Sequence, residues 1–137
     1  MPDQSAITGQ VNRWYKFLFD NYESIRLPNG PCIKIASPSV FLATKLEAFS
    51  HRGNDYLTGH DIEDVVTVID GRADIVSKHV AAPAPVQKFV SNALYAHLSH
   101  TDFLTAVSGY FPGDAASQQR VPAALARLRK IAAVARD

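Results

Sequence analysis

Two short β-like segments, in a chain whose other apolar patterns are helical, constrain the fold more than any other feature. Residues 24–27 and 32–35 are these segments, and they are separated by a strong turn sequence, Pro28-Asn29-Gly30-Pro31. Two strands are not stable alone in water, so we expect another element to cover or extend them. The pattern predicts an α+β fold that is mostly α, with a short two-stranded β edge followed by a helical bundle.

Apolar residues at three- and four-residue steps predict helices on both sides of the hairpin. The first predicted helix covers residues 10–22, with Trp14 and Tyr15 on its apolar face. The later ones cover residues 38–51, 61–70, 72–81, 86–98, 103–110 and 122–135. No linker divides the chain, so we expect one domain over residues 1–137, with a sheet portion at 1–36 and the bundle at 37–137.

Charge and cysteine content narrow the function classes. The formal net charge of +1 gives no global attraction to nucleic acid or to an anionic membrane. The single cysteine, Cys32, allows no internal disulfide, which is typical of a reducing compartment. No signal peptide and no membrane span is indicated. We therefore expect a cytoplasmic protein with no membrane partner.

A lysine on an apolar helix face is the first candidate functional residue. Lys45 lies in the middle of the face formed by Phe41, Leu42, Leu46 and Phe49. Burying an unpaired ammonium is costly, so Lys45 must reach water or meet a partner. Asp61, in the first turn of the next predicted helix, is the expected partner. In the structural interpretation, Asp61 stabilises its helix N-terminus and pairs with Lys45.

The same stretch also resembles a bacterial enzyme family. The segment from Phe41 to Phe49, then Arg52, then His60-Asp61-Ile62-Glu63-Asp64, resembles the region after the catalytic strand in AbiEii-type nucleotidyltransferases. These belong to the DNA polymerase β-like superfamily, and several are toxins of toxin–antitoxin systems. The resemblance implies catalytic roles for Lys45 and Asp61, and nucleotide binding by Lys45, Arg52 and Asp64. His60 stands where the family usually has an arginine.

One departure from that family matters more than the match. Relatives carry a Gly-Ser or Gly-Gly turn and then an Asp-x-Asp whose carboxylates hold Mg²⁺, and this sequence contains neither motif. We therefore expect a truncated or catalytically incomplete nucleotidyltransferase-like protein, related to enzymes that act on RNA or protein. The resemblance makes residues 1–36 the remnant of the nucleotidyltransferase sheet. The Mg²⁺ and the nucleoside triphosphate are implied for full-length relatives, with no metal site in this chain. The alternative is a non-catalytic interaction module or partner subunit.

Other candidate residues have plainer interpretations. His97 and His100 could form a metal pair, but without a third ligand we interpret the histidines as surface residues. Cys32 is interpreted as a small buried hydrophobe. The last helix has a basic side, which we interpret as a solvated face, with RNA binding as the minority hypothesis. Its residues are Arg120, Arg127, Arg129, Lys130 and Arg136.

The strand edges predict a partner. Two strands leave backbone donors and acceptors unpaired along an edge, which can template another strand. We therefore expect a homodimer, or a partner chain, bound through residues 24–35.

Overall fold

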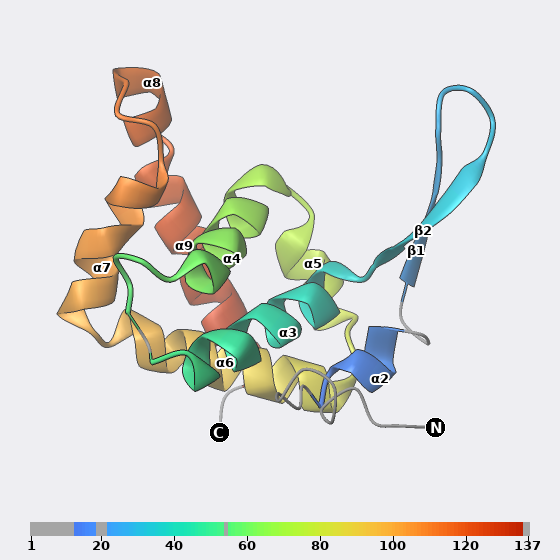
Figure 1. Cartoon of the computed structure of the whole chain (residues 1–137), viewed down its shortest axis with the longest axis horizontal. Helices are drawn as coiled ribbons and strands as arrows, with labels where there is room; N and C mark the ends of the chain where they lie inside the picture. Colours follow the sequence, from blue (N-terminus) through green and yellow to red (C-terminus); the bar gives the residue numbers. More distant parts are fainter. Residues whose placement is uncertain (1–12, 19–21, 54, 136–137) are drawn as a thin grey trace.

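The computed structural model of the chain describes residues 13–18, 22–53 and 55–135, and it is mostly helical (Figure 1). In chain order the elements are α2 (Tyr15–Leu18), β1 (Tyr22–Arg26), β2 (Cys32–Ala36), α3 (Pro38–His51), α4 (His60–Gly71), α5 (Ile75–Val80), α6 (Ala84–Leu98), α7 (Thr101–Val107), the 3₁₀ turn η1 (Ser108–Tyr110), α8 (Ala115–Gln118) and α9 (Val121–Ala132). In the part of the chain that is described, every helix is too short or too polar to cross a bilayer.

Strands β1 and β2 form the predicted antiparallel hairpin, with a register that runs from Tyr22 opposite Ala36 to Arg26 opposite Cys32. Gly30 closes its turn at φ 109°, a conformation that only glycine adopts without strain. The hairpin extends away from the helices in Figure 1. Tyr22 was expected in the first helix, and that prediction was wrong because its backbone pairs with β2. The part of that helix before residue 13 lies outside the described residues.

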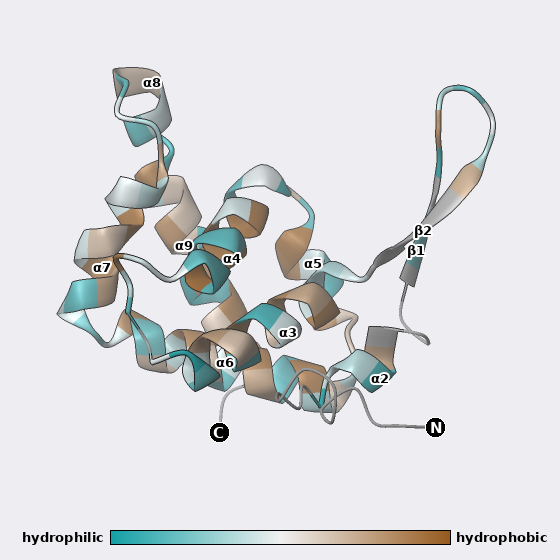
Figure 2. Ribbon diagram, viewed as in Figure 1, coloured by the Kyte–Doolittle hydropathy of each residue, from teal (hydrophilic) through white to brown (hydrophobic). Residues whose placement is uncertain are grey.

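The helices that follow the hairpin pack into one body around a shared apolar core. Helix α3 packs against α4 and α6, and α9 packs against α4 and α6. Figure 2 shows teal and brown patches alternating along these helices, as expected of amphipathic helices. The largest fully buried side chains include, from α3, α4, α6, α7 and α9, Phe49, Phe103, Leu42, Leu46, Ile62, Ile69, Leu94, Leu128 and Ile131. The predicted helical bundle is therefore present, whereas the described residues form no sheet beyond the hairpin.

Long-range polar bonds tie α9 into this body. The Arg127 guanidinium donates from Nη1 to the carbonyl oxygens of Ile69 and Asp70, at 3.0 and 2.8 Å. These carbonyls lie in the last turn of α4, where intrahelical donors are missing. One arginine of the predicted solvated face therefore caps another helix instead.

The core also contains a buried histidine, which corrects the interpretation of the histidines as surface residues. His79 is fully buried between Ser39 and Ser91, with Nδ1 3.3 Å from Ser39 Oγ and Nε2 3.0 Å from Ser91 Oγ. Ser91 donates its own hydrogen to the Ile131 carbonyl, so His79 Nε2 must donate to Ser91, and Nδ1 accepts from Ser39. Burial lowers the pKa of His79 to about 4, so the ring is neutral near pH 7.

Two further side-chain predictions receive mixed outcomes. Cys32 is exposed on the hairpin, so its interpretation as a buried hydrophobe was wrong, because the hairpin extends from the core that would have covered it. Trp14 is buried against Phe17 and Phe89, as the first apolar face predicted. Tyr15, assigned to the same face, is 45% exposed.

Candidate functional site

Lys45, Arg52, Asp61 and Asp64 form a group of alternating charges where α3 meets α4, which we call the charge cluster. Lys45 Nζ lies 2.9 Å from Asp64 Oδ2 and 3.7 Å from Asp61 Oδ1. Arg52 Nη1 donates to Asp61 Oδ2 at 2.7 Å. Asp61 thus joins the two cations, one on each carboxylate oxygen.

The four side chains differ strongly in their exposure. The Asp61 side chain is 8% exposed, whereas those of Lys45, Asp64 and Arg52 are 30%, 46% and 57% exposed. The buried carboxylate therefore forms the floor of the charge cluster, and the two cations are accessible from solvent. The Lys45 ammonium also lies 5.6 Å from the centroid of the Phe41 ring, within cation–π range.

Local sequence explains why these residues meet. Lys45 and Arg52 are seven residues apart, so both lie on one side of α3, and Arg52 is its C-cap residue. Gly53 then reverses the chain at φ 95°. Asp61 lies in the first turn of α4, where the helix dipole favours a carboxylate, and Asp64 follows three residues later on the same side.

The connection between the two helices depends on Gly59, which immediately precedes α4. A Cβ at this position would lie 2.5 Å from both the Asp55 carbonyl oxygen and Phe49 Cε1. The loop can therefore pack directly on the Phe49 ring only with glycine here. This close contact sets the position of the α4 N-terminus, and hence of Asp61, relative to α3.

The predicted proximity of Lys45 and Asp61 is confirmed by this geometry. The sequence interpretation gave Lys45 the wrong main partner, because Asp64 is closer to its ammonium than Asp61 is. It also did not foresee the contact between Arg52 and Asp61. The three-residue spacing of Asp61 and Asp64 was the available signal, since it places both carboxylates on one side of α4.

The arrangement does not suit Mg²⁺, the ion that the resemblance implies for relatives. Both carboxylates of the charge cluster already face cationic side chains, which would repel a metal ion. Within the described ranges, no three His, Cys, Asp or Glu side chains gather into a group that could hold a metal. His97 contacts an aromatic side chain instead, with Nδ1 2.8 Å from the Tyr56 hydroxyl.

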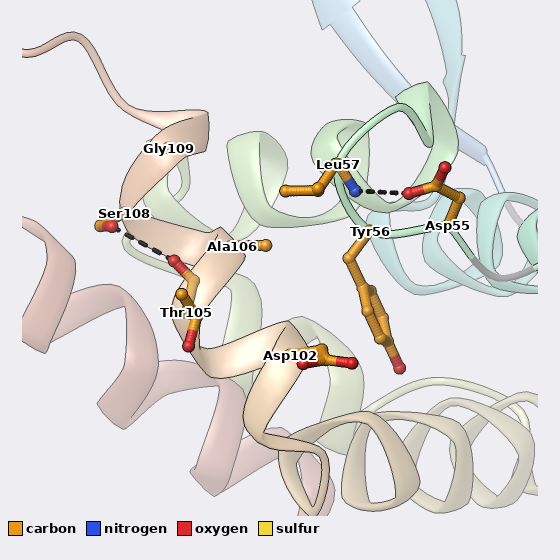
Figure 3. Close-up of a pocket in the computed structure, with 8 residues that line it drawn as sticks. All are labelled: Asp55, Tyr56, Leu57, Asp102, Thr105, Ala106, Ser108 and Gly109. Carbon is orange, nitrogen blue, oxygen red and sulfur yellow. Dashed lines mark hydrogen bonds between the residues drawn. The ribbon is translucent and has the colours of Figure 1, made fainter.

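A separate cavity of about 550 Å³ lies between the α3–α4 connection and α7, and none of the charge-cluster residues line it (Figure 3). Tyr56 and Leu57 form one wall, and Asp102 and Ala106 form the wall that faces them. No sequence pattern indicated this cavity, because the connection was interpreted only as a helix break. Its carboxylates are exposed, and Asp55 is engaged by its own turn through the Leu57 amide and the Thr58 hydroxyl. The cavity is large enough for a small ligand, but no buried carboxylate among the described residues lines it to select one.

The basic side of the last helix is only partly available to a partner. Arg120 pairs with Asp70 at 3.3 Å, and Arg127 caps α4, so both contribute to contacts within the body. Arg129 and Lys130 are exposed, and Arg136 lies outside the described residues. The surface that remains is small for an RNA backbone, whose binding rests on many phosphate contacts.

Comparisons with protein-family models, with curated proteins and with solved structures give no match for this chain. Functional inference therefore depends on the side chains themselves and on the family resemblance carried by residues 41–64.

Proposed function

We propose that this chain is a nucleotidyltransferase-like protein whose charge cluster binds the phosphates of a nucleoside triphosphate. The observation that carries the proposal is the pair of solvent-accessible cations, Lys45 and Arg52, held on either side of the buried Asp61 carboxylate. Ammonium and guanidinium groups are the usual protein partners of phosphate oxygens. A carboxylate between them fixes their positions, so a ligand would meet cations that are already oriented.

For the chain alone we propose nucleotide binding without nucleotide transfer. The 137 residues contain no Asp-x-Asp, and the carboxylates of the charge cluster face cations. We therefore expect no transfer of nucleotide to RNA or protein by this chain, and we derive no step through Mg²⁺. RNA, as an acceptor or a partner, remains part of the proposal only through the family resemblance.

Titration of the purified protein with each nucleoside triphosphate, followed by calorimetry, tests the proposal. We expect Lys45→Met to weaken binding about ten- to hundredfold, because a charge-assisted hydrogen bond to phosphate contributes about 1.5–3 kcal/mol. Lys130→Met is the matched control, since Lys130 is exposed on α9 and forms no part of the charge cluster. Absence of binding by the wild type, or equal binding by Lys45→Met, would contradict the proposal.

Incubation with labelled triphosphate, Mg²⁺ and total tRNA tests the expectation that the chain alone transfers no nucleotide. We expect no labelled RNA or protein, and robust labelling would show that the chain has a metal-binding arrangement that the charge cluster does not provide.

The hairpin favours a second candidate, a module that binds a partner chain or a second copy of itself. Strands β1 and β2 pair only with each other among the described residues, so the outer side of each strand is open to another strand. The hairpin also extends from the body, where a partner could reach both sides (Figure 1). A symmetric dimer through residues 24–35 is the simplest closed assembly.

Light scattering over a range of concentrations distinguishes this candidate. We expect a dimer that Ile33→Lys weakens, because Ile33 lies in the middle of β2, opposite Ile25 in the register. Asn29→Lys is the matched control, since it adds the same charge in the turn. A monomer at every concentration would exclude self-association.

A further inference from the structure

The two carboxylates of the charge cluster are held very differently. Asp61 is nearly buried, accepts the short bond from Arg52 and lies in the first turn of α4, where the helix dipole stabilises its charge. Asp64 is about half exposed, and Lys45 is the cation that it contacts. Asp61 is therefore a fixed part of the fold, whereas Asp64 can exchange Lys45 for water at little cost.

Whereas Asp64 contacts one cation among the described residues, the Lys45 ammonium contacts several groups. It lies close to Asp64, at a longer distance from Asp61, and within cation–π range of the Phe41 ring. If Asp64 moves away, Asp61 and Phe41 still hold the ammonium near its present position. An anion could therefore replace Asp64 without displacing Lys45.

The spacing of the cations favours a particular anion class. Lys45 and Arg52 contact opposite oxygens of the Asp61 carboxylate, which lies between them, so their charged groups are farther apart than two oxygens of a single carboxylate or phosphate. A single phosphate can engage one of them closely, whereas a chain of two or three phosphates can contact both at once. Arg52 is the more exposed of the two, and Asp61 engages only one of its nitrogens at hydrogen-bond distance, which leaves further N–H donors for a ligand.

We propose that Asp64 occupies the phosphate position on Lys45, so that the charge cluster binds a di- or triphosphate only by displacing Asp64. This inference rests on the proposed function, and it adds a specific competitor within the chain and a preference for polyphosphate over single phosphate. Removing the Asp64 charge strengthens binding, although Asp64 belongs to the same charge cluster as the residues that bind.

Calorimetry with inorganic tripolyphosphate and with orthophosphate, on the full chain, tests the proposal. We expect Asp64→Asn to bind tripolyphosphate about two- to fivefold more tightly than the wild type, the range of a half-exposed ion pair. Asp70→Asn is the matched control, because Asp70 is on the same helix and its loss also frees an arginine, Arg120. Asp70→Asn should leave the affinity unchanged, and adding Lys45→Met to Asp64→Asn should remove the gain. Asp64→Ser repeats the test if the asparagine variant is unstable.

The possible outcomes distinguish the competition by Asp64 from the proposed phosphate binding on which it rests. Wild-type binding that Asp64→Asn and Asp64→Ser leave unchanged would overturn the competition while the proposed function stands. Equal gains for Asp64→Asn and Asp70→Asn would also overturn it, since the effect would then be one of net charge. Orthophosphate binding as tight as that of tripolyphosphate would overturn the polyphosphate preference. Absence of binding by the wild type and by Asp64→Asn would overturn the proposed function itself.

Discussion

The helical body and the hairpin are stabilised by different interactions. The body buries large apolar side chains from α3, α4, α6 and α9 around one core, and its buried histidine, His79, is hydrogen-bonded through both ring nitrogens. The hairpin depends on its own backbone pairing and on Glu23, which contacts Arg72 and Lys78, each at 3.3 Å. Apolar burial is largely insensitive to salt, whereas half-exposed ion pairs are screened by it. The two regions should therefore respond differently to the same perturbation.

The largest effect is expected from Phe49→Ala, which removes a ring with 1% exposure from the body. Phe49 packs near Tyr56 and His97, with ring centroids 5.5 and 5.4 Å away, so its loss leaves a cavity that rigid neighbours cannot fill. We expect the free energy of unfolding to fall by about 3–5 kcal/mol. Urea unfolding measures it, and a loss below about 1 kcal/mol would contradict the picture of a close-packed body.

A slightly smaller loss is expected from Gly59→Ala, which adds one carbon to the α3–α4 connection. The new Cβ would clash with the Asp55 carbonyl oxygen and the Phe49 ring, and overpacking of this kind costs about 1–3 kcal/mol. Gly71→Ala, in the last position of α4 with nothing within 4 Å of the added carbon, is the matched control and should be neutral or stabilising. Equal thermal stability of the two variants would refute this account of the loop.

Mild acid should destabilise the body through His79. The unfolded ring takes up a proton near its ordinary pKa of 6.5, whereas burial holds the folded pKa at about 4, so the unfolded state binds more protons between these values. Stability therefore falls as the pH drops, by about 2 kcal/mol between pH 7 and pH 5 for this group. Burial also lowers the pKa of His97 to about 4, which adds a contribution of the same sign.

Urea unfolding at several pH values measures the slope of the free energy of unfolding against pH. His79→Gln should reduce it, whereas His60→Gln should not, because the His60 side chain is 91% exposed. A slope that is unchanged in His79→Gln would assign the acid sensitivity to other groups.

The smallest effect is expected from Glu23→Gln, which weakens the attachment of the hairpin. Two partly exposed ion pairs contribute about 1 kcal/mol or less each, so the midpoint of global unfolding should hardly change. Amide hydrogen exchange in residues 22–36 should accelerate, and added salt should have the same effect on the wild type. Glu63→Gln, on the exposed side of α4, is the control. Equal acceleration throughout the body would mean that the two regions are not separately stabilised.

The same contrast explains what could be predicted from the sequence. The helices of the body follow from apolar periodicity, and the hairpin follows from a turn sequence that few other structures accommodate. The meeting of Lys45 and Asp61 was predictable because both positions are fixed by helix geometry. These features are local, so neighbouring residues specify them.

The missed features depend on residues far apart in the sequence. His79 was expected at the surface, but it is enclosed by Ser39 and Ser91, which lie on two other helices. Cys32 was expected to be buried because it lies in a predicted strand with no activating partner in the sequence, whereas it is exposed on a hairpin that extends away from the helices. The preference of Lys45 for Asp64 depends on the rotation of α4 about its axis, which a helical pattern alone does not fix.

The bonds from α4 and α6 to α9 have a consequence for how the chain matures on the ribosome. Arg127 and the Ile131 carbonyl are synthesised some 60 and 40 residues after their partners, Ile69 and Ser91. Until α9 emerges from the exit tunnel, the last carbonyls of α4 lack their donor and the apolar side of α6 lacks its cover. The nascent chain should therefore remain a substrate for chaperones until α9 has emerged, and only then acquire resistance to protease. Stalled chains that end before residue 121 should be cleaved readily, whereas chains that expose α9 should be protected.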